Sequence, residues 1–355
     1  MTDCAQTDPI AIATETYWIG DRPPGQLLYC NSYVRRFPGD ETYDLLVDPA
    51  STCDFQVVLH KLEALLGSVA AVDAIAINHQ DPDISASVAA LLQGELEGRP
   101  ILASDDTGEL IHNYHDVPEE QFVSLEDYPS GLTLPSGQTL DPIFAPFGHH
   151  RGATMLFEPQ CGVLFSGDLF SSLSNPDPEE PASLYFKDDN LRDLKAFHQI
   201  HMPTQAVMEQ AIAAIEDLPA PLKLIAPQHG ALITEDHFDA VFDTLRHLAV
   251  GVDLLDASPL DEEDRRWEAL WQTLCEDMPS TPPAALQGST RREFESALRQ
   301  WTDALATEAV PQLQYAAIVG AHQRDLPTPR VTVDETRAKI ERRDLPSSED
   351  HFRAL

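Results

Sequence analysis

Three side chains with metal-binding atoms stand at alternate positions in the stretch "NHQDPDI", residues 78–84. They are His79, Asp81 and Asp83; they follow an apolar run directly, and Ile84 stands beside them. On an extended loop, residues i, i+2 and i+4 can point toward one centre. Imidazole nitrogen and carboxylate oxygen suit hard and intermediate cations. The stretch therefore predicts a metal site at the end of a buried strand.

Three further residues that can bind a metal follow other apolar stretches: His149 in "FGHHRG", Asp168 in "LFSGDLF" and His229 in "APQHG". With the first three they complete two sets of imidazole and carboxylate groups. If the sets share Asp168, its carboxylate can bridge two cations and offset their repulsion. Such a mixture of ligands with open positions favours iron chemistry with dioxygen over a closed zinc site.

Four short apolar stretches must position these residues, and each is typical of a strand. They lie within residues 69–78, 140–153, 162–170 and 221–232. If the four strands are neighbours, their ends meet at one edge of a sheet, which is where open α/β sheets bind ligands. The sequence therefore predicts a common site at that edge.

Amphipathic helices are predicted between the strands. Apolar residues recur on one face of residues 54–67, and Gly67 supplies a C-terminal stop. Further helices are expected within residues 85–96, 204–218 and 234–252, the last two capped by Thr204 and Thr234. Earlier strands are expected within residues 14–20, 25–37 and 42–50. This alternation is typical of sheets covered by helices.

The charge balance is strongly acidic, with 59 Asp and Glu against 23 Lys and Arg and a net charge of -36. This argues against nucleic acid and membranes as partners, because both would repel the chain. The five cysteines are odd in number and widely spaced, as expected of reduced thiols in a cytoplasmic protein. No signal peptide and no membrane span are expected.

In order and context, "NHQDPD", "FGHHRG", "LFSGDLF" and "APQHG" resemble the motifs of the metallo-β-lactamase fold. Hydrolases of that fold carry HxHxDH, whereas its flavodiiron and oxygen-binding diiron branch carries HxExDH, which the acidic Asp81 resembles. The resemblance implies an α/β fold, a metallo-β-lactamase-like αββα sandwich with a C-terminal helical extension. No flavodoxin-like phosphate loop follows the core, so no flavin domain is expected within the chain.

The predicted organisation has four parts. Residues 1–250 form the metallo-β-lactamase-like diiron domain, and residues 251–288 form an acidic, Pro-rich connection with a short helix. Residues 289–325 form a helical extension, and residues 326–355 form a polar, loosely ordered tail. The resemblance concerns only the first of these parts.

The resemblance implies one iron held by His79, Asp81 and His149, another held by Asp83 and His229, and Asp168 bridging the two. Asp81 stands in place of the usual Glu, which is one methylene longer. Ile84 stands where the family has His, so the second metal loses a protein ligand. Three interpretations stay open: the position is free for water, an exogenous ligand or dioxygen; His150 reaches in from the neighbouring loop; or the second site is weak.

The leading hypothesis is a non-heme diiron protein that binds or reduces dioxygen, with nitric oxide as a second candidate. It would act as an oxidoreductase reset by an external flavoprotein or rubredoxin-like donor, or as an oxygen sensor. The resemblance also implies a homodimer. The alternative is a zinc-dependent hydrolase of an ester, thioester or phosphodiester, against which Asp81 and Ile84 both count. A third hypothesis is an interaction protein without metal.

Two further pairs of histidines have the spacing i, i+3: His112 with His115, and His198 with His201. Such a pair can share one face of a helix. A partly exposed helix, or a position around the metal centre, is a better interpretation than direct metal binding. Neither pair is therefore counted among the ligands.

Overall fold

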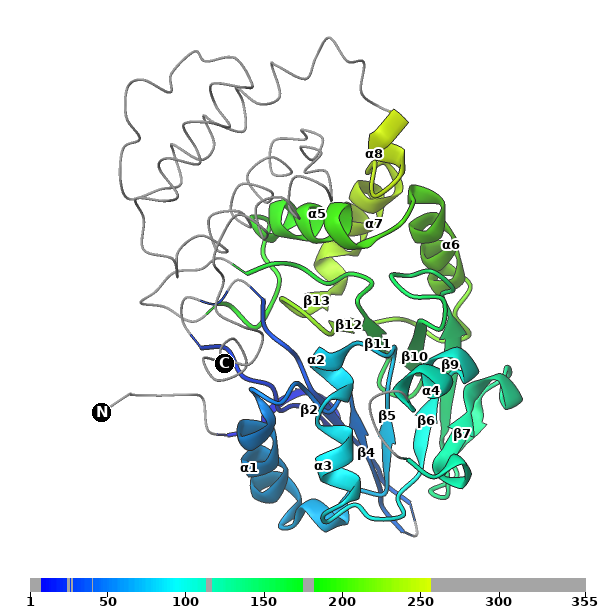
Figure 1. Cartoon of the computed structure of the whole chain (residues 1–355). Coiled ribbons are helices and arrows are strands. Elements are labelled where there is room, and N and C mark those ends of the chain that lie inside the picture. The colour runs from blue at the N-terminus through cyan, green and yellow to red at the C-terminus, as the bar shows by residue number, and fades with distance from the viewer. Residues whose placement is uncertain are drawn as a thin grey trace, which may run out of the picture. The chain divides into compact units, whose positions relative to one another are not determined.

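Two β-sheets form the centre of the computed structural model (Figure 1). The first has seven strands in the spatial order β1 (Ile10–Ala13), β2 (Thr16–Trp18), β3 (Tyr33–Phe37), β4 (Tyr43–Val47), β5 (Ala74–Ala76), β6 (Ile101–Ala103) and β7 (Phe122–Ser124). The second has six, in the order β13 (Ile233–Thr234), β12 (Leu224–Pro227), β11 (Val163–Gly167), β10 (Thr154–Glu158), β9 (Thr139–Phe144) and β8 (Leu132–Thr133). The structure describes residues 8–23, 26, 28–39, 41–112, 117–174 and 182–256.

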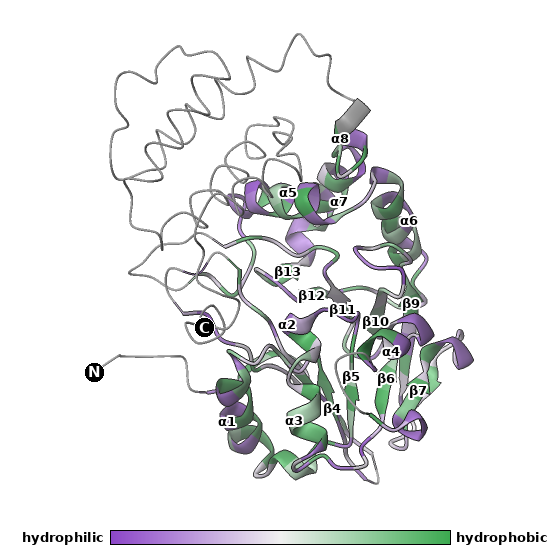
Figure 2. Ribbon diagram, in the orientation of Figure 1, coloured by the Kyte–Doolittle hydropathy of each residue, from purple (hydrophilic) through white to green (hydrophobic). Residues whose placement is uncertain are grey.

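Alternate residues of the central strands face opposite sides of the sheet. In β4, Leu45 and Val47 belong to an apolar cluster that includes Phe165 of β11 and Ala226 of β12, whereas Leu46 lies in a separate cluster with residues of the helices. One core therefore fills the space between the sheets and another lies under the helices. Figure 2 shows β4, β5 and β6 largely in green, while α1 and α5 carry both green and purple residues.

Helices cover the outer faces of both sheets (Figure 1). The helices that alternate with the later strands of the first sheet along the chain are α1 (Phe55–Leu66), α2 (Pro82–Ser85), α3 (Val88–Leu92) and α4 (Asp105–Ile111). The second carries α5 (Asn190–His201), α6 (Gln205–Glu216), α7 (Phe238–Arg246) and α8 (Asp253–Asp256). Short 3-10 turns are η1 (Val69–Ala71), η2 (Glu119–Gln121), η3 (Leu125–Asp127) and η4 (Glu235–His237). The arrangement confirms the predicted αββα sandwich.

Helix α1 confirms the helix predicted over residues 54–67. Its residues Val58 and Leu62 are fully buried. Gly67 ends it in the left-handed conformation, with φ of 84°, and donates its N–H to the Glu63 carbonyl at 2.8 Å. Glycine adopts this conformation without the steric cost that a Cβ would bring, which explains the stop.

Other local predictions were wrong in detail. Helices α6 and α7 lie in the predicted ranges, but neither Thr204 nor Thr234 makes a side-chain cap hydrogen bond. The strand predicted over residues 69–78 is limited to β5, because Ser68 caps a 3-10 turn before it. The helix predicted over residues 85–96 is limited to α3, because α2 begins earlier, at Pro82, and ends at Ser85.

The prediction that all four strand ends belong to one sheet edge was also wrong. Strand β5 lies in the first sheet, whereas β9, β11 and β12 lie in the second. The two sheets meet close to the end of β5, where the Asn78 carbonyl accepts a hydrogen bond from Thr154 N at 3.0 Å. Stacking of the sheets, rather than strand pairing, therefore brings the four strand ends to the same place.

Several predictions lie outside the described residues. These include His115, in residues 113–116, the part of the connection (residues 251–288) that follows residue 256, and the whole of the helical extension and tail. The domain boundaries stay predictions. Among the helices that the structure describes, none is long and apolar enough to cross a membrane.

Candidate metal centre

The six predicted ligands come from the ends of four strands and one short helix. His79 and Asp81 lie in the loop after β5, and Asp83 lies in the first turn of α2. His149 lies in the loop between β9 and β10, Asp168 directly follows β11, and His229 follows β12. The structure thus brings together residues from four segments that are far apart in the sequence: residues 79–83, His149, Asp168 and His229.

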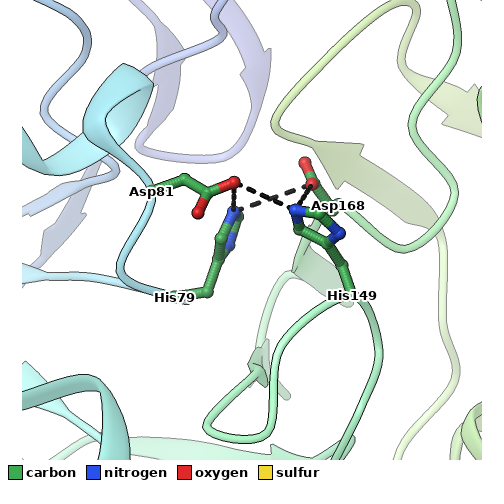
Figure 3. A group of neighbouring side chains, drawn as sticks. All are labelled: His79, Asp81, His149 and Asp168. Carbon is green, nitrogen blue, oxygen red and sulfur yellow. Dashed lines mark hydrogen bonds and ion pairs between the residues drawn. The ribbon is translucent and has the colours of Figure 1, made fainter. Parts of the chain in front are cut away.

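The first group consists of His79, Asp81, His149 and Asp168, whose ligand atoms all lie within 4.8 Å of one another. His149 Nε2 lies 2.9 Å from Asp81 Oδ2 and 3.6 Å from Asp168 Oδ2. His79 Nε2 lies 3.8 Å from Asp81 Oδ2 and 3.7 Å from Asp168 Oδ2. Figure 3 shows the four side chains pointing toward one another, His79 and Asp81 from one loop and His149 and Asp168 from two other segments.

The second group consists of Cys30, Asp83 and His229, whose ligand atoms also lie within 4.8 Å of one another. His229 Nε2 lies 3.1 Å from Asp83 Oδ2 and 3.4 Å from Asp168 Oδ1. Asp168 therefore presents Oδ2 to the first group and Oδ1 to the second, as a bridging carboxylate would. His79, Asp81 and Asp83 do not share one centre, because Asp83 turns to the second group.

Cys30 was missed by the sequence analysis, which treated all cysteines as reduced thiols. It lies in the long connection between β2 and β3, away from every motif. No local spacing links it to His229. Only the tertiary fold places the two side chains together.

His150 and Ile84 occupy different surroundings. His150 Nε2 lies 2.6 Å from Asp81 Oδ1, and its ring stacks 5.6 Å from that of His79. The structure therefore places His150 beside the first group. Ile84 is fully buried in the apolar cluster that contains Val58 of α1.

Two of the imidazoles, those of His149 and His229, are oriented by backbone carbonyls on their outer side. His229 Nδ1 lies 2.6 Å from the Tyr29 carbonyl, and His149 Nδ1 lies 3.3 Å from the His201 carbonyl. A carbonyl only accepts hydrogen bonds, so Nδ1 carries the proton in both rings. Nε2 is thereby directed to the carboxylates, which is the arrangement that orients metal-binding histidines.

Burial and opposite charges act against each other on the pKa values of the two groups. Burial lowers the pKa of His79. Burial also acts to lower the pKa of His229, but hydrogen bonds with Asp83 and Cys30 and the charge of Asp168 together outweigh it and raise this pKa well above its ordinary value. Burial acts to raise the pKa of Asp81, yet hydrogen bonds with His149 and His150 hold it well below its usual range. The histidines and aspartates of the two groups thus form ionic pairs with one another. A bound cation would replace the histidine protons as the positive partner of the carboxylates.

Three buried polar atoms in these groups have no hydrogen-bond partner among the described residues: His79 Nε2, Asp83 Oδ1 and Asp168 Oδ1. Buried polar atoms are nearly always paired, and those that are not point to an ion or water. Nitrogen and oxygen donors of this kind suit intermediate divalent cations, iron included. The residues present therefore fit a pair of metal ions.

The histidines of α5 support the centre from outside. His198 is fully buried; its Nδ1 donates to the Leu194 carbonyl at 2.8 Å, and its Nε2 accepts from Phe170 N–H at 3.1 Å. Phe170 has a φ of 67° in the turn that follows Asp168. His198 therefore holds this turn in place and has no nitrogen left for a metal.

Comparisons with known proteins found relatives among flavorubredoxins and diiron proteins. Among curated relatives, the chain is 26% identical over 239 residues to an anaerobic nitric oxide reductase flavorubredoxin from Aliivibrio fischeri, covering 63% of this chain and 46% of that protein. A flavorubredoxin of the same name from Vibrio vulnificus is 24% identical over 212 residues, covering 58% of this chain and 40% of that protein. The chain thus spans about half the length of the curated relatives it matches.

Solved structures share the fold at lower identity. The chemotaxis sensor ODP, solved as a peroxy diiron species, gives a TM-score of 0.56 at 22% identity, covering 70% of this chain and 97% of that one. The rubredoxin oxygen:oxidoreductase from Desulfovibrio gigas gives 0.59 at 14% identity, covering 88% and 75%. Residues 28–230, more than half of the chain, match the family model described as ODP family beta lactamase. The chain belongs to this family.

Proposed function

We propose that this protein is a non-heme diiron protein that binds or reduces dioxygen, with nitric oxide as the second candidate ligand. The observation that carries the proposal is Asp168, whose two oxygens face two separate groups of metal-binding side chains, 3.7 Å from His79 and 3.4 Å from His229. The family membership supports it.

The residues are proposed to divide as the two groups do. His79, Asp81 and His149 would hold one iron, Asp83 and His229 the other, and Asp168 would be shared. Ferrous ions bound there would supply electrons to a bound gas. His149 and His229 keep their Nδ1 protons on carbonyls, so the Nε2 atoms of these two residues stay directed to the metals.

The exposure of the side chains indicates how a small molecule would enter. The side chains of His79 and Asp168 are 2% and 3% exposed, so they form the floor of the site. The side chains of Asp81 and His150 are 27% and 28% exposed. His150 contacts both Asp81 and solvent, and is therefore suited to carry protons between water and the centre.

Electrons are proposed to come from an external flavoprotein or rubredoxin-like donor. The names of the curated relatives, flavorubredoxins, support a redox partner of this class. In a sensor, by contrast, the occupied centre would signal to a partner, and the similarity to a chemotaxis sensor supports that version. A homodimer in the cytoplasm stays part of the proposal.

The hydrolase alternative is not favoured. Asp81 stands where hydrolases of this fold carry His, and it lies in ionic contact with His149 and His150. The relatives found are named for nitric oxide and oxygen chemistry. No observation of the described residues favours an ester or phosphodiester substrate.

The test is metal content per chain after anaerobic production with iron and zinc both present, followed by absorbance spectra before and after admitting air or nitric oxide. Two irons per chain and a new charge-transfer band on exposure are expected. Zinc in both positions, with no spectral response to either gas, would contradict the proposal and favour the hydrolase.

A further inference from the structure

Cys30 lies in the second metal group although no motif contains it. Its sulfur, an Asp83 carboxylate oxygen and a His229 nitrogen all lie within 4.8 Å of one another. Cys30 is 8% exposed. A thiol, a carboxylate and an imidazole gathered at this distance are a set of donors that one metal ion can bind together.

The backbone fixes Cys30 in this place. On one side of it, the Tyr29 carbonyl accepts from His229 Nδ1 at 2.6 Å. On the other side, Asn31 N donates to the Gln228 carbonyl at 2.6 Å. Because both neighbours of Cys30 are bonded to the loop that carries His229, the thiol is held next to the imidazole.

Buried side chains reinforce this junction of the two loops. Asn31 Nδ2 donates to the carbonyls of Pro227 and Gly230, at 2.8 and 3.0 Å. Asn31 Oδ1 accepts from Trp18 Nε1 at 2.8 Å and from Arg22 Nη2 at 3.1 Å. Asn31 is fully buried, so the junction is protected from water. Cys30 is thus preorganised by hydrogen bonds that, apart from the one made by His229, involve none of the proposed metal ligands.

A second observation points to a cation in this group. Asp168 is 4% exposed, and its Oδ1, which lies 3.4 Å from His229 Nε2, has no hydrogen-bond partner among the described residues. Asp83 Oδ1 is likewise buried without such a partner. Two buried carboxylate oxygens without a hydrogen-bond partner among the described residues, beside one imidazole and one thiol, form surroundings that suit a cation.

The position after Asp83 supplies no ligand. Ile84 has no donor atom, and its side chain is fully buried in the apolar cluster beneath α1 and α3. His150, the other candidate, lies 2.6 Å from Asp81 in the first group. Without Cys30, the second metal would have only Asp83, His229 and a share of Asp168.

We propose that Cys30 is a thiolate ligand of the second metal ion and replaces the nitrogen ligand that Ile84 cannot supply. On binding, the S–H bond breaks, the metal–sulfur bond forms and the proton leaves to water. The second ion then has one sulfur, one nitrogen and carboxylate oxygens, and the first has only nitrogen and oxygen. The two positions of the centre are therefore chemically different.

This proposal rests on the proposed function, because it requires two metal ions. The probe is Co²⁺, added anaerobically to the full metal-free chain, since a thiolate ligand gives cobalt a charge-transfer band in the near ultraviolet. We expect the chain to bind two Co²⁺. We expect the charge-transfer band to appear on binding of only one of these two ions. Fewer than two Co²⁺ would overturn both proposals. Two Co²⁺ without the band would overturn only the role of Cys30.

Variants assign the sulfur. Cys30→Ser should lose the band and bind the second Co²⁺ at least ~10–100-fold more weakly, while the first binds as before. Cys53→Ser is the matched control, because Cys53 is an exposed free cysteine, and it should keep the band and both ions. An unchanged band in Cys30→Ser, or its loss in Cys53→Ser, would contradict the assignment.

X-ray absorption by the wild-type protein decides the question if Cys30→Ser does not fold. With two Co²⁺ bound, the spectrum should contain a sulfur neighbour at about 2.3 Å, the usual length for a thiolate on a divalent ion of this size. Nitrogen and oxygen neighbours alone would overturn the proposal without affecting the diiron assignment.

Discussion

Asp168 lies between two histidines of different groups, with Oδ1 3.4 Å from His229 Nε2 and Oδ2 3.7 Å from His79 Nε2. The carboxylate follows β11 directly and is almost completely buried. A buried carboxylate that faces separate partners with separate oxygens is arranged to bridge two cations. The proposed diiron centre depends on this position of Asp168 between the two groups.

The first prediction concerns Asp168 itself. Asp168→Ala removes the shared ligand, so metal content per chain should fall sharply at both positions. Asp243→Ala is the control, because the Asp243 side chain is 78% exposed and lies on α7. Elemental analysis after anaerobic loading checks the prediction, and unchanged metal content in Asp168→Ala would refute the ligand assignment.

The second prediction uses a matched pair of glycines. Gly230 has a φ of 74°, and a Cβ there would overlap the side chain and carbonyl of Ser172, whereas Gly67 has a φ of 84° and open space around it. Gly67→Ala should lower the free energy of unfolding by ~1–2 kcal/mol, the cost of the left-handed conformation alone. Gly230→Ala should cost more and also displace His229, which precedes it.

Urea unfolding and metal titration of both glycine variants provide the measurement. We expect weakened binding of the second metal only in Gly230→Ala. Equal stability losses in the two variants, with normal metal content, would show that Gly230 does not position His229.

The third prediction concerns His198. Burial lowers its pKa from 6.5 to about 4. The folded protein therefore binds fewer protons than the unfolded chain in this range, so this group contributes stability above pH 6.5 that is lost as the pH falls toward 4. His198→Phe removes both the titration and the acceptor for Phe170 N–H, and should cost about 1–3 kcal/mol at neutral pH.

Urea unfolding of the metal-free protein between pH 7 and pH 5 tests this prediction. The quantity to compare is the difference in free energy of unfolding between the wild type and His198→Phe. The difference should shrink as the pH falls, because only the wild type loses the contribution of neutral His198. His247→Phe is the control, since the His247 side chain is 75% exposed. A difference independent of pH would contradict the prediction.

The fourth prediction concerns protons released by metal binding. Hydrogen bonds with Asp83 and Cys30 and the charge of Asp168 together outweigh burial and raise the pKa of His229, so in the metal-free protein Nε2 holds a proton that a cation must displace. Metal affinity should therefore rise with pH until this pKa is passed. Calorimetric titration in two buffers of different ionisation enthalpy counts the protons, and binding without proton release would refute this.

The sequence predicted the six candidate ligands because each stands in a recognisable motif close to a strand end, and the structure brings their side chains together. Their division into two groups followed from the family resemblance and agrees with the distances. Which strands pair was not predictable from these motifs: β5 and β11 belong to different sheets, and only the stacking of the sheets brings their ends together.

Cys30 shows most clearly what sequence patterns leave out. Its place beside His229 depends on hydrogen bonds of Tyr29 and Asn31 to a loop near residue 229, and such long-range contacts leave no periodic signal. The sequence patterns also did not predict where a turn forms in place of a strand. Ser68 caps a 3-10 turn within a stretch whose apolar composition had predicted a continuous strand.

The measurement that tests the central claim most directly is Mössbauer spectroscopy of the iron-loaded protein after exposure to air. A bridging Asp168 predicts two ferric ions in equal amounts whose spins are coupled, giving a diamagnetic ground state. Isolated, magnetically uncoupled ferric ions would show that the two groups do not form one binuclear centre, and would contradict the account.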